Sequence, residues 1–380
     1  QPARDAPRPE GRERDKKVQS RAEAKLGDME SVSEPWGQVI ASQEDMVGLG
    51  HAVLEREIGI IETRRDGHMP VAPVDLRPLV CHRLLSYAVG GDDASGNGGL
   101  AMVDVTVFGA GAFGLSVAWC CARRGARVRV VDPGGVGAGA SGGIVGALAP
   151  HVPEQWNEKK AFQLESLLMA EAFWDEVERI GGLSPGYGRT GRWQPVADDE
   201  ALARAKARAE GAGQLWRGRA TWEVIRRPGG DWVPETPTGY LIHDTLTARL
   251  HPAKACDALA AAIRAKGGEI VPEGRGEGQI LHATGWQGLA ALTARHTRLV
   301  GAGIKGQAVL LDHDAARMPQ LFVDGLHIVP HADGTVAIGS TTEREFDIPD
   351  VTDAQCETLL ARARGALPAL ADAPELRRWA

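Results

Sequence analysis

Three glycines have the spacing with which a polypeptide backbone can approach a phosphate group. Gly109, Gly111 and Gly114 follow the G-x-G-x-x-G pattern directly after the apolar run Val105–Phe108. The first glycine permits a tight turn, the second lets a pyrophosphate approach the main chain, and the third allows a helix to pack closely. The pattern predicts a strand, a glycine turn and a helix that ends just before Gly125.

A carboxylate and a second loop of small residues follow, as the binding of a dinucleotide requires. Residues 127–131 predict a second strand, and Asp132 at its end can accept hydrogen bonds from a ribose hydroxyl. In the glycine-rich loop that follows, Ser141 can donate to a phosphate, and Gly142 and Gly143 offer unobstructed backbone amides. The alternative is an ordinary glycine turn that binds no ligand, but the strand, helix, second strand and acid together favour dinucleotide binding.

Composition limits the class of protein. The chain has 380 residues, of which 43% are hydrophobic and 48 are glycine, and this suits a soluble α/β protein with a large core. A net charge of −7 without a basic stripe gives no reason to expect nucleic acid. Five cysteines show no metal-binding spacing, and a reducing cytoplasm is the simplest interpretation of them. We find no apolar run long enough to span a membrane, and because the first residues are charged and lack an apolar core we expect no signal peptide.

Residues 1–101 differ in composition from the rest. Residues 1–27 are rich in charge and proline, and residues 90–99 have the composition of a flexible linker. We expect this part to be a disordered or poorly ordered extension that precedes a natural start at Met102. A regulatory domain is the alternative.

The later chain predicts further helices and an antiparallel sheet. A helix is expected over residues 158–180, with one buried stripe, and others over 201–212 and within 244–266. The apolar segments 304–311, 325–329 and 335–340 predict an antiparallel sheet that forms the floor of a substrate pocket. Thr352 and Gln355 form a possible capping box for the last helix. The stripe expected on the first helix consists of Phe162, Met169, Phe173, Val177 and Ile180.

These segments together resemble the D-amino-acid oxidase family of FAD-dependent oxidoreductases, and within it the glycine oxidases. The similarity covers residues 103–380 and begins with the two glycine motifs. Further matches follow in the same order, at residues 186–192 (GYGRTGR), 250–259, 280–285 (ILHATG), 305–307 (KGQ) and 327–343.

The resemblance implies an α/β fold, with a Rossmann-like FAD-binding domain and an antiparallel-sheet α+β substrate domain. The FAD-binding domain would comprise residues 102–185 and 244–300, and the substrate domain residues 186–243 and 301–380. The implied FAD contacts are Gly109, Ala110, Gly111, Phe113, Gly114, Asp132, Ser141, Gly142, Gly143, Val271, Thr284 and Gly285. The chain would end before the family's last FAD-domain segment, so we expect a C-terminally truncated protein that lacks the carboxylate-binding arginine and is not a working enzyme.

The implied activity is oxidation of an amine or amino acid by hydride transfer to flavin, with oxygen or another electron acceptor restoring the cofactor. His327 and His331 stand where relatives often carry tyrosine and arginine, so they are candidate substrate residues, although a surface or packing role is the alternative. Three other functions stay open: a dehydrogenase of the same fold that passes electrons to a carrier, a non-catalytic FAD-binding fragment, and an NAD-dependent dehydrogenase. The last has no need of the motif at residues 139–143.

Overall fold

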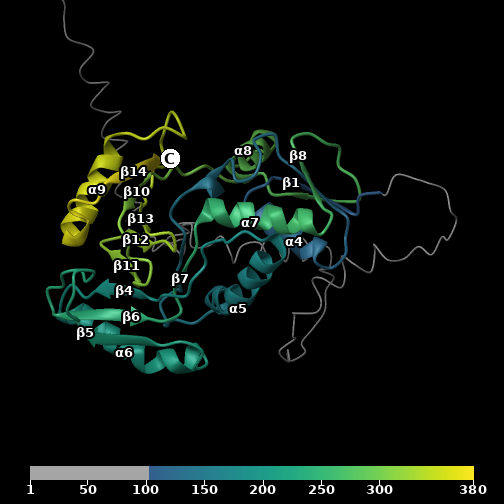
Figure 1. The fold of residues 1–380 in the computed structure, drawn as a ribbon. Helices are drawn as coiled ribbons and strands as arrows, with labels where there is room; N and C mark the ends of the chain where they lie inside the picture. Colours follow the sequence, from purple (N-terminus) through teal and green to yellow (C-terminus); the bar gives the residue numbers. More distant parts are fainter. Residues whose placement is uncertain (1–101) are drawn as a thin grey trace, which may run out of the picture. The chain divides into compact units, whose positions relative to one another are not determined.

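The computed structural model describes residues 102–380 (Figure 1). The extension and linker predicted within residues 1–101 lie outside the described residues. Two main β-sheets organise the described part, one of four strands and one of eight, and a short two-stranded sheet lies beside them.

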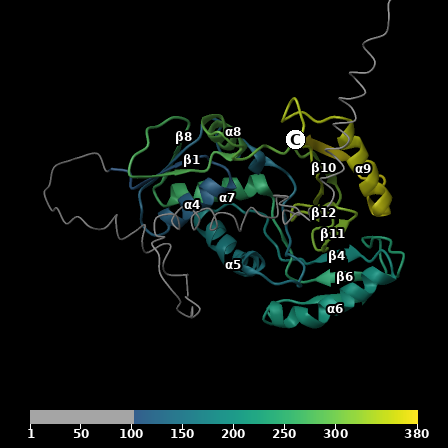
Figure 2. The same cartoon turned by 180° about the vertical axis from the view of Figure 1, so that it is seen from behind.

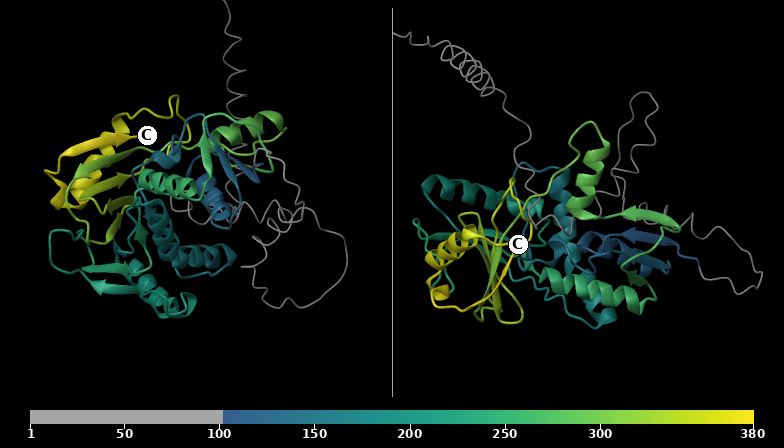
Figure 3. Two further views of the ribbon diagram at one scale, coloured as in Figure 1. Left: turned by 45° about the vertical axis from the view of Figure 1, so that its right-hand side comes forward. Right: turned by 90° about the horizontal axis from the view of Figure 1, so that it is seen from above.

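The four-stranded sheet is parallel, as the glycine motif predicts. Its order is β8-β2-β1-β9, and Val107 of β1 lies opposite Val130 of β2 and Leu281 of β9. Helices α4 and α7 pack on one side of these strands and α5 packs on α7, whereas Figure 3 shows α8 on the opposite side. The bounds are β1 (Val105–Phe108), α4 (Ala112–Ala122), β2 (Val128–Val131), α5 (Glu158–Gly181), α7 (Pro252–Ala265), β8 (Glu269–Val271), β9 (Gln279–His282) and α8 (Gly285–Arg295).

Helix α5 has nearly the predicted length, but the predicted buried face is wrong in part. Met169 of the expected stripe is 49% exposed, whereas Trp174, outside that stripe, is buried. The reason is close contact with α7: a Cβ atom on Gly181 would lie 2.8 Å from the backbone nitrogen of Ala262 and 2.9 Å from the carbonyl oxygen of Ala258. This contact sets the rotation of α5 about its axis, and its apolar pattern alone does not.

The large sheet has the order β14-β10-β13-β12-β11-β4-β6-β5. All its pairings are antiparallel except that of β11 with β4. Helix α9 lies along one side of it and α6 lies beside β5 (Figure 2). The bounds are β4 (Arg192–Pro195), α6 (Asp199–Leu215), β5 (Trp222–Arg226), β6 (Tyr240–Asp244), β10 (Ala308–Asp312), β11 (Gln320–Val323), β12 (Leu326–Pro330), β13 (Thr335–Gly339), α9 (Ala354–Ala366) and β14 (Glu375–Trp379). The antiparallel sheet predicted from residues 304–340 is present, although its first strand begins at Ala308.

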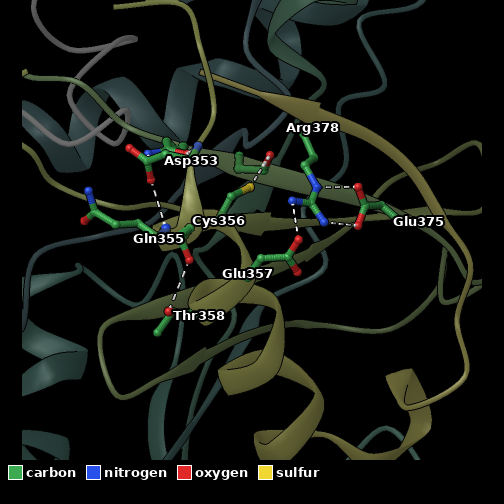
Figure 4. A network of polar contacts seen from close by, with 10 residues as sticks. Asp353, Gln355, Cys356, Glu357, Thr358, Glu375 and Arg378 are labelled. Atoms are coloured by element: carbon green, nitrogen blue, oxygen red, sulfur yellow. Dashed lines mark hydrogen bonds and ion pairs between the residues drawn. The ribbon is translucent and has the colours of Figure 1, made fainter. Parts of the chain in front are cut away.

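Contacts at the start of α9 tie the helix to the last strand (Figure 4). The N-cap is Asp353, whose carboxylate accepts a hydrogen bond from the Gln355 amide at 2.9 Å. The predicted capping box, which begins at Thr352, is therefore wrong by one residue. Arg378 of β14 pairs with Glu357 of α9 and with Glu375, both at 2.6 Å.

The two faces of the large sheet serve different purposes, because side chains alternate along each strand. Val309, Leu321 and Ile328 face the core that includes Leu359 and Leu360 of α9. On the other face, Ala308, Val329 and Ala337 pack against Ile144, Val145 and Ala147. This second face therefore receives the chain that follows the second glycine loop. Ala147 belongs to β3 (Ala147–Leu148), which pairs with β7 (Ala248–Arg249).

Candidate cofactor and substrate site

The first glycine turn lies against the end of β9. Gly109 has φ +113°, and a Cβ atom there would lie 2.2 Å from the carbonyl oxygen of Ala283. A Cβ atom on Gly114 would lie 1.9 Å from the carbonyl oxygen of Gly109. Both positions therefore exclude a side chain. The contact brings Thr284 and Gly285, at the start of α8, next to the turn.

The carboxylate of Asp132 is oriented by backbone amides. One oxygen accepts a hydrogen bond from Ala110 at 2.7 Å, and the other accepts one from Gly134 at 2.9 Å. The Asp132 amide donates to the carbonyl oxygen of Val271 at 3.0 Å, so Val271 lies beside the acid. Each carboxylate oxygen has a further lone pair, which leaves room for a hydroxyl donor.

The N-terminus of α4 provides amides and a hydroxyl. Gly111 is the N-cap and makes no side-chain cap, and the first turn, which contains Phe113, carries no acidic residue. The buried Ser141 accepts a hydrogen bond from the Ala112 amide at 3.0 Å, and a Cβ atom on Gly111 would lie 3.1 Å from Ser141 Oγ. The positive end of the helix dipole and such amides suit a pyrophosphate.

The second loop is as tightly built as the first. A Cβ atom on Gly142 would lie 2.4 Å from the carbonyl oxygen of Gly137, and Gly143 follows at the C-cap of the short 3-10 helix Ala140–Gly142. Amides, one hydroxyl and one carboxylate thus meet near the carboxyl ends of parallel strands, where α/β sheets bind dinucleotides. The donor set fits the pyrophosphate and ribose of FAD.

The chain then passes from this loop onto the large sheet. Val145 lies over Gly339 of β13, where an added Cβ atom would lie 2.6 Å from its Cγ2. His327 of β12 lies directly opposite Gly339 in the strand register, and its ring centroid is 4.6 Å from that of Phe322. His327, the first candidate substrate residue, is therefore next to the segment that leads from the cofactor loops.

His331, the second candidate, belongs to a buried pair. It is 2% exposed, its ring centroid is 4.8 Å from that of His251, and its Nδ1 lies 3.0 Å from Thr335 Oγ1. Burial, together with the neighbouring His251, lowers the pKa of His331 to about 4. This geometry favours a packing role, with the imidazole neutral at pH 7.

A buried ion pair near His327 was not singled out from the sequence. Arg192 is 9% exposed, and its Nε lies 3.1 Å from a carboxylate oxygen of Asp244, which is fully buried. The guanidinium carbon lies 5.7 Å from the centroid of the Phe322 ring. No direct signal in the sequence pointed to this pair, because Asp244 lies 52 positions after Arg192. The arginine at the start of a short strand was the one feature that could have drawn attention to it.

Comparison with known proteins identifies the family. Residues 104–380 match the sequence profile of the DAO family, described as FAD dependent oxidoreductase. The chain belongs to this FAD-dependent oxidoreductase family.

Individual proteins are similar to the same part of this oxidoreductase. A glycine oxidase of Pseudomonas aeruginosa is 28% identical over 315 residues, which cover 73% of this chain and 81% of that protein. The glycine oxidase of Bacillus cereus has a similar structure, with a TM-score of 0.61 and 19% identity, covering 73% of this chain and 81% of that one. An iminodiacetate oxidase of a Chelativorans species has a TM-score of 0.56 and 20% identity, covering 72% and 82%. The structural likeness supports the predicted Rossmann-like α/β fold.

The KGQ segment of the oxidoreductase has a structural role. Lys305 Nζ lies 3.8 Å from Glu343 and 3.9 Å from Asp353. Gln307 donates hydrogen bonds to the same two carboxylates at 3.0 and 2.9 Å. The network joins the start of β10 to the chain after β13 and to the cap of α9.

Two kinds of feature are absent from the described part of the oxidoreductase. Within residues 102–380, no group of three or more histidine, cysteine, aspartate or glutamate side chains could hold a metal ion. The helices in the same residues are too short or too polar to cross a membrane.

Proposed function

We propose that this chain binds FAD and, in contrast to the inactive protein expected from the sequence, oxidises an amine or amino acid by hydride transfer to the flavin, as its relatives named glycine oxidase suggest. The observation that carries the proposal is the continuous path from the glycine turns through Ile144 and Val145 to the face of the large sheet that bears His327. This path would put a dinucleotide bound at the turns within reach of a substrate on that face. The proposed domain division is the one expected from the sequence.

The proposed cofactor contacts follow the donor groups. Asp132 would hold the ribose, the first turn of α4 with Ser141 would hold the pyrophosphate, and Val271 would lie beside the adenine. The remaining contacts would come from backbone in the two glycine turns and at the start of α8. The full proposed set is Gly109, Ala110, Gly111, Phe113, Gly114, Asp132, Ser141, Gly142, Gly143, Val271, Thr284 and Gly285.

The bound flavin would supply a two-electron acceptor, so the protein needs few reactive side chains. Ile144 and Val145 are 1% and 4% exposed, and with Val329 they would keep water from the reacting carbon. His327 would hold or release a proton at the polar end of the substrate. Cys256 and Cys356 are free thiols, which supports the proposal of a reducing, cytoplasmic location.

The experiment adds FAD to the purified 380-residue chain and records its visible spectrum and the rate of amine oxidation. We expect the absorption bands of bound oxidised flavin, and bleaching of those bands under anaerobic conditions with an amino acid. Peroxide formation in air identifies oxygen as the acceptor, whereas reduction of an added dye alone identifies an electron carrier. A colourless protein that binds NAD would overturn the proposal.

Asp132→Ala and Asp104→Ala make a matched pair of variants for this experiment. Asp104 lies just before β1, at the opposite end of the strands, and its carboxylate pairs with Arg127 at 2.6 Å. Only the Asp132 variant is expected to lose flavin affinity, so equal losses would point to a general effect on folding.

A further inference from the structure

We propose that the substrate carries a second acidic group, remote from the reacting amine, and that Arg192 binds this group. The proposal rests on the proposed function and specifies its substrate class as dicarboxylic amino acids or amines. It makes Arg192 a specificity-determining residue on the face of the large sheet that bears His327.

The Nε atom of Arg192 has a hydrogen-bond partner, whereas its two terminal nitrogens have none among the described residues. Its Nε donates to Asp244 Oδ2 at 3.1 Å, and the second oxygen of Asp244 accepts a hydrogen bond from the Thr247 amide at 2.7 Å. Its two terminal nitrogens contact no hydrogen-bond acceptor among residues 102–380. Those nitrogens form a planar fork, which suits a carboxylate.

Buried oxygen atoms at the same corner also lack partners. Thr247 Oγ1 and Gln320 Oε1 belong to fully buried side chains and have no hydrogen-bond partner among the described residues. Gln320 lies directly opposite Arg192 in the register of β11 and β4. Buried polar groups in folded proteins are nearly always bonded. The Thr247 hydroxyl can donate to an acidic group, whereas Gln320 Oε1 can only accept and needs a water molecule as its donor.

The distance between Arg192 and the residues Gly339 and His327 determines how long a ligand must be to contact both regions. Strands β13, β12, β11 and β4 are consecutive, so the backbones of Gly339 and Arg192 are at least about 14 Å apart at ordinary strand spacing. The Arg192 side chain reaches back over Phe322, which contacts His327, and this places the guanidinium within about 10 Å of the His327 ring. A glycine molecule cannot reach both places, whereas a molecule with an acidic group several bonds from its amine can.

The test compares two unreactive probes by calorimetry on the FAD-loaded chain: glutarate, which has two carboxylates, and pentanoate, which has one. We expect glutarate to bind at least about tenfold more tightly, since one charge-assisted contact has that magnitude. The double variant Arg192→Met, Asp244→Asn should lose this preference. It leaves no buried charge unpaired, and asparagine still accepts the Thr247 bond.

Arg189→Met is the matched control. Arg189 is half-buried in the same segment, but its nitrogens donate to the carbonyl oxygens of Thr245 and Arg219 at 2.8 and 2.9 Å. This variant should keep the preference for glutarate. Equal affinity of the parent chain for the two probes would overturn the proposal, and so would a preference that survives in the double variant.

The proposal and the proposed function can fail separately. If the chain binds no FAD, the function fails, and the same calorimetry without FAD still measures the role of Arg192. If the chain oxidises amino acids but does not favour glutamate over glutamine in kcat/KM, the inference about Arg192 is wrong and the function stands. If the double variant does not fold, the affinities of the parent chain for glutarate and pentanoate still test the proposal, because equal affinities overturn it.

Discussion

His331 is expected to make the free energy of unfolding fall as the pH is lowered from 6.5 towards 4. Burial, together with His251, lowers the pKa of His331 to about 4, whereas the unfolded chain takes up the same proton near pH 6.5. Among the other charged groups that face the ring, Arg249 lowers the pKa of His331 and Asp333 raises it. The neutral imidazole is favoured in the fold, so its stabilisation is present above pH 6.5 and is lost as the pH falls.

The magnitude follows from the difference in pKa. It amounts to about 3 kcal/mol once both states are fully protonated, and to about 2 kcal/mol at pH 5. Urea unfolding at pH 7.5 and pH 5, followed by tryptophan fluorescence, measures this loss. In His331→Gln, where the amide can still bond Thr335, the stability difference between the two pH values should shrink by about 2 kcal/mol.

The control is His296→Gln, because His296 is exposed at the end of α8; it removes one histidine and leaves the buried pair of His331 and His251 intact. Protonation of Asp333 does not contribute to the loss of stability between pH 7.5 and pH 5. Although burial opposes it, hydrogen bonds from Lys254 and Thr335 hold the pKa of Asp333 well below its ordinary value, so its effect lies at lower pH. If His331→Gln lost stability between pH 7.5 and 5 as much as the parent, the buried neutral imidazole would be refuted.

Three further substitutions test the cofactor turn and the fold. Asp132→Ala should weaken FAD binding by about 1–3 kcal/mol, the loss of a hydrogen bond to a charged group, as measured by flavin titration. Gly109→Ala should destabilise the fold by more than about 1 kcal/mol in urea unfolding, because the added Cβ would meet Ala283 and φ is +113°. Glu343→Ala should cost about 3 kcal/mol in the same assay, because the buried Lys305 loses the buried one of its two carboxylate partners and keeps only the more exposed Asp353.

The control for Asp132→Ala is Asp104→Ala, described above, and the two stability variants have controls of their own. Gly211→Ala in α6 adds a Cβ atom where no atom lies within 4 Å, so it should not destabilise the fold. Glu343→Gln keeps the side-chain length and a hydrogen-bond acceptor, so it should cost less than Glu343→Ala. Undiminished flavin affinity in Asp132→Ala would contradict the ribose assignment. Parent-like stability of Gly109→Ala or of Glu343→Ala would contradict the packing described for that residue.

The parallel sheet and its glycine turn could be predicted because their signals are local. The run Val105–Phe108, the glycines after it and Asp132 lie within 28 consecutive residues, and a short-range backbone pattern determines their order in space. The antiparallel pairing of β12 and β13 was predicted for the same reason, since the two apolar segments that form it lie close together in the sequence.

The face of a helix and the partners of a buried charge could not be predicted in this way. Met169 and Trp174 both fit an amphipathic helix, and only the contact of Gly181 with α7 determines which of them is buried. Arg192 and Asp244 each look like exposed charges in the sequence, and they meet because β4 pairs with β6.

The sequence by itself determined the region around the parallel sheet: the order of strand, turn and helix, the small residues that backbone contacts require, and the acid at the end of the second strand. The tertiary structure alone decided how side chains meet on the large sheet. It placed Val145 over Gly339, paired His331 with His251 and put Arg192 on the same face as His327. The physical reason is that steric requirements of the backbone act over a few residues, whereas strand register and sheet packing join side chains more than fifty positions apart.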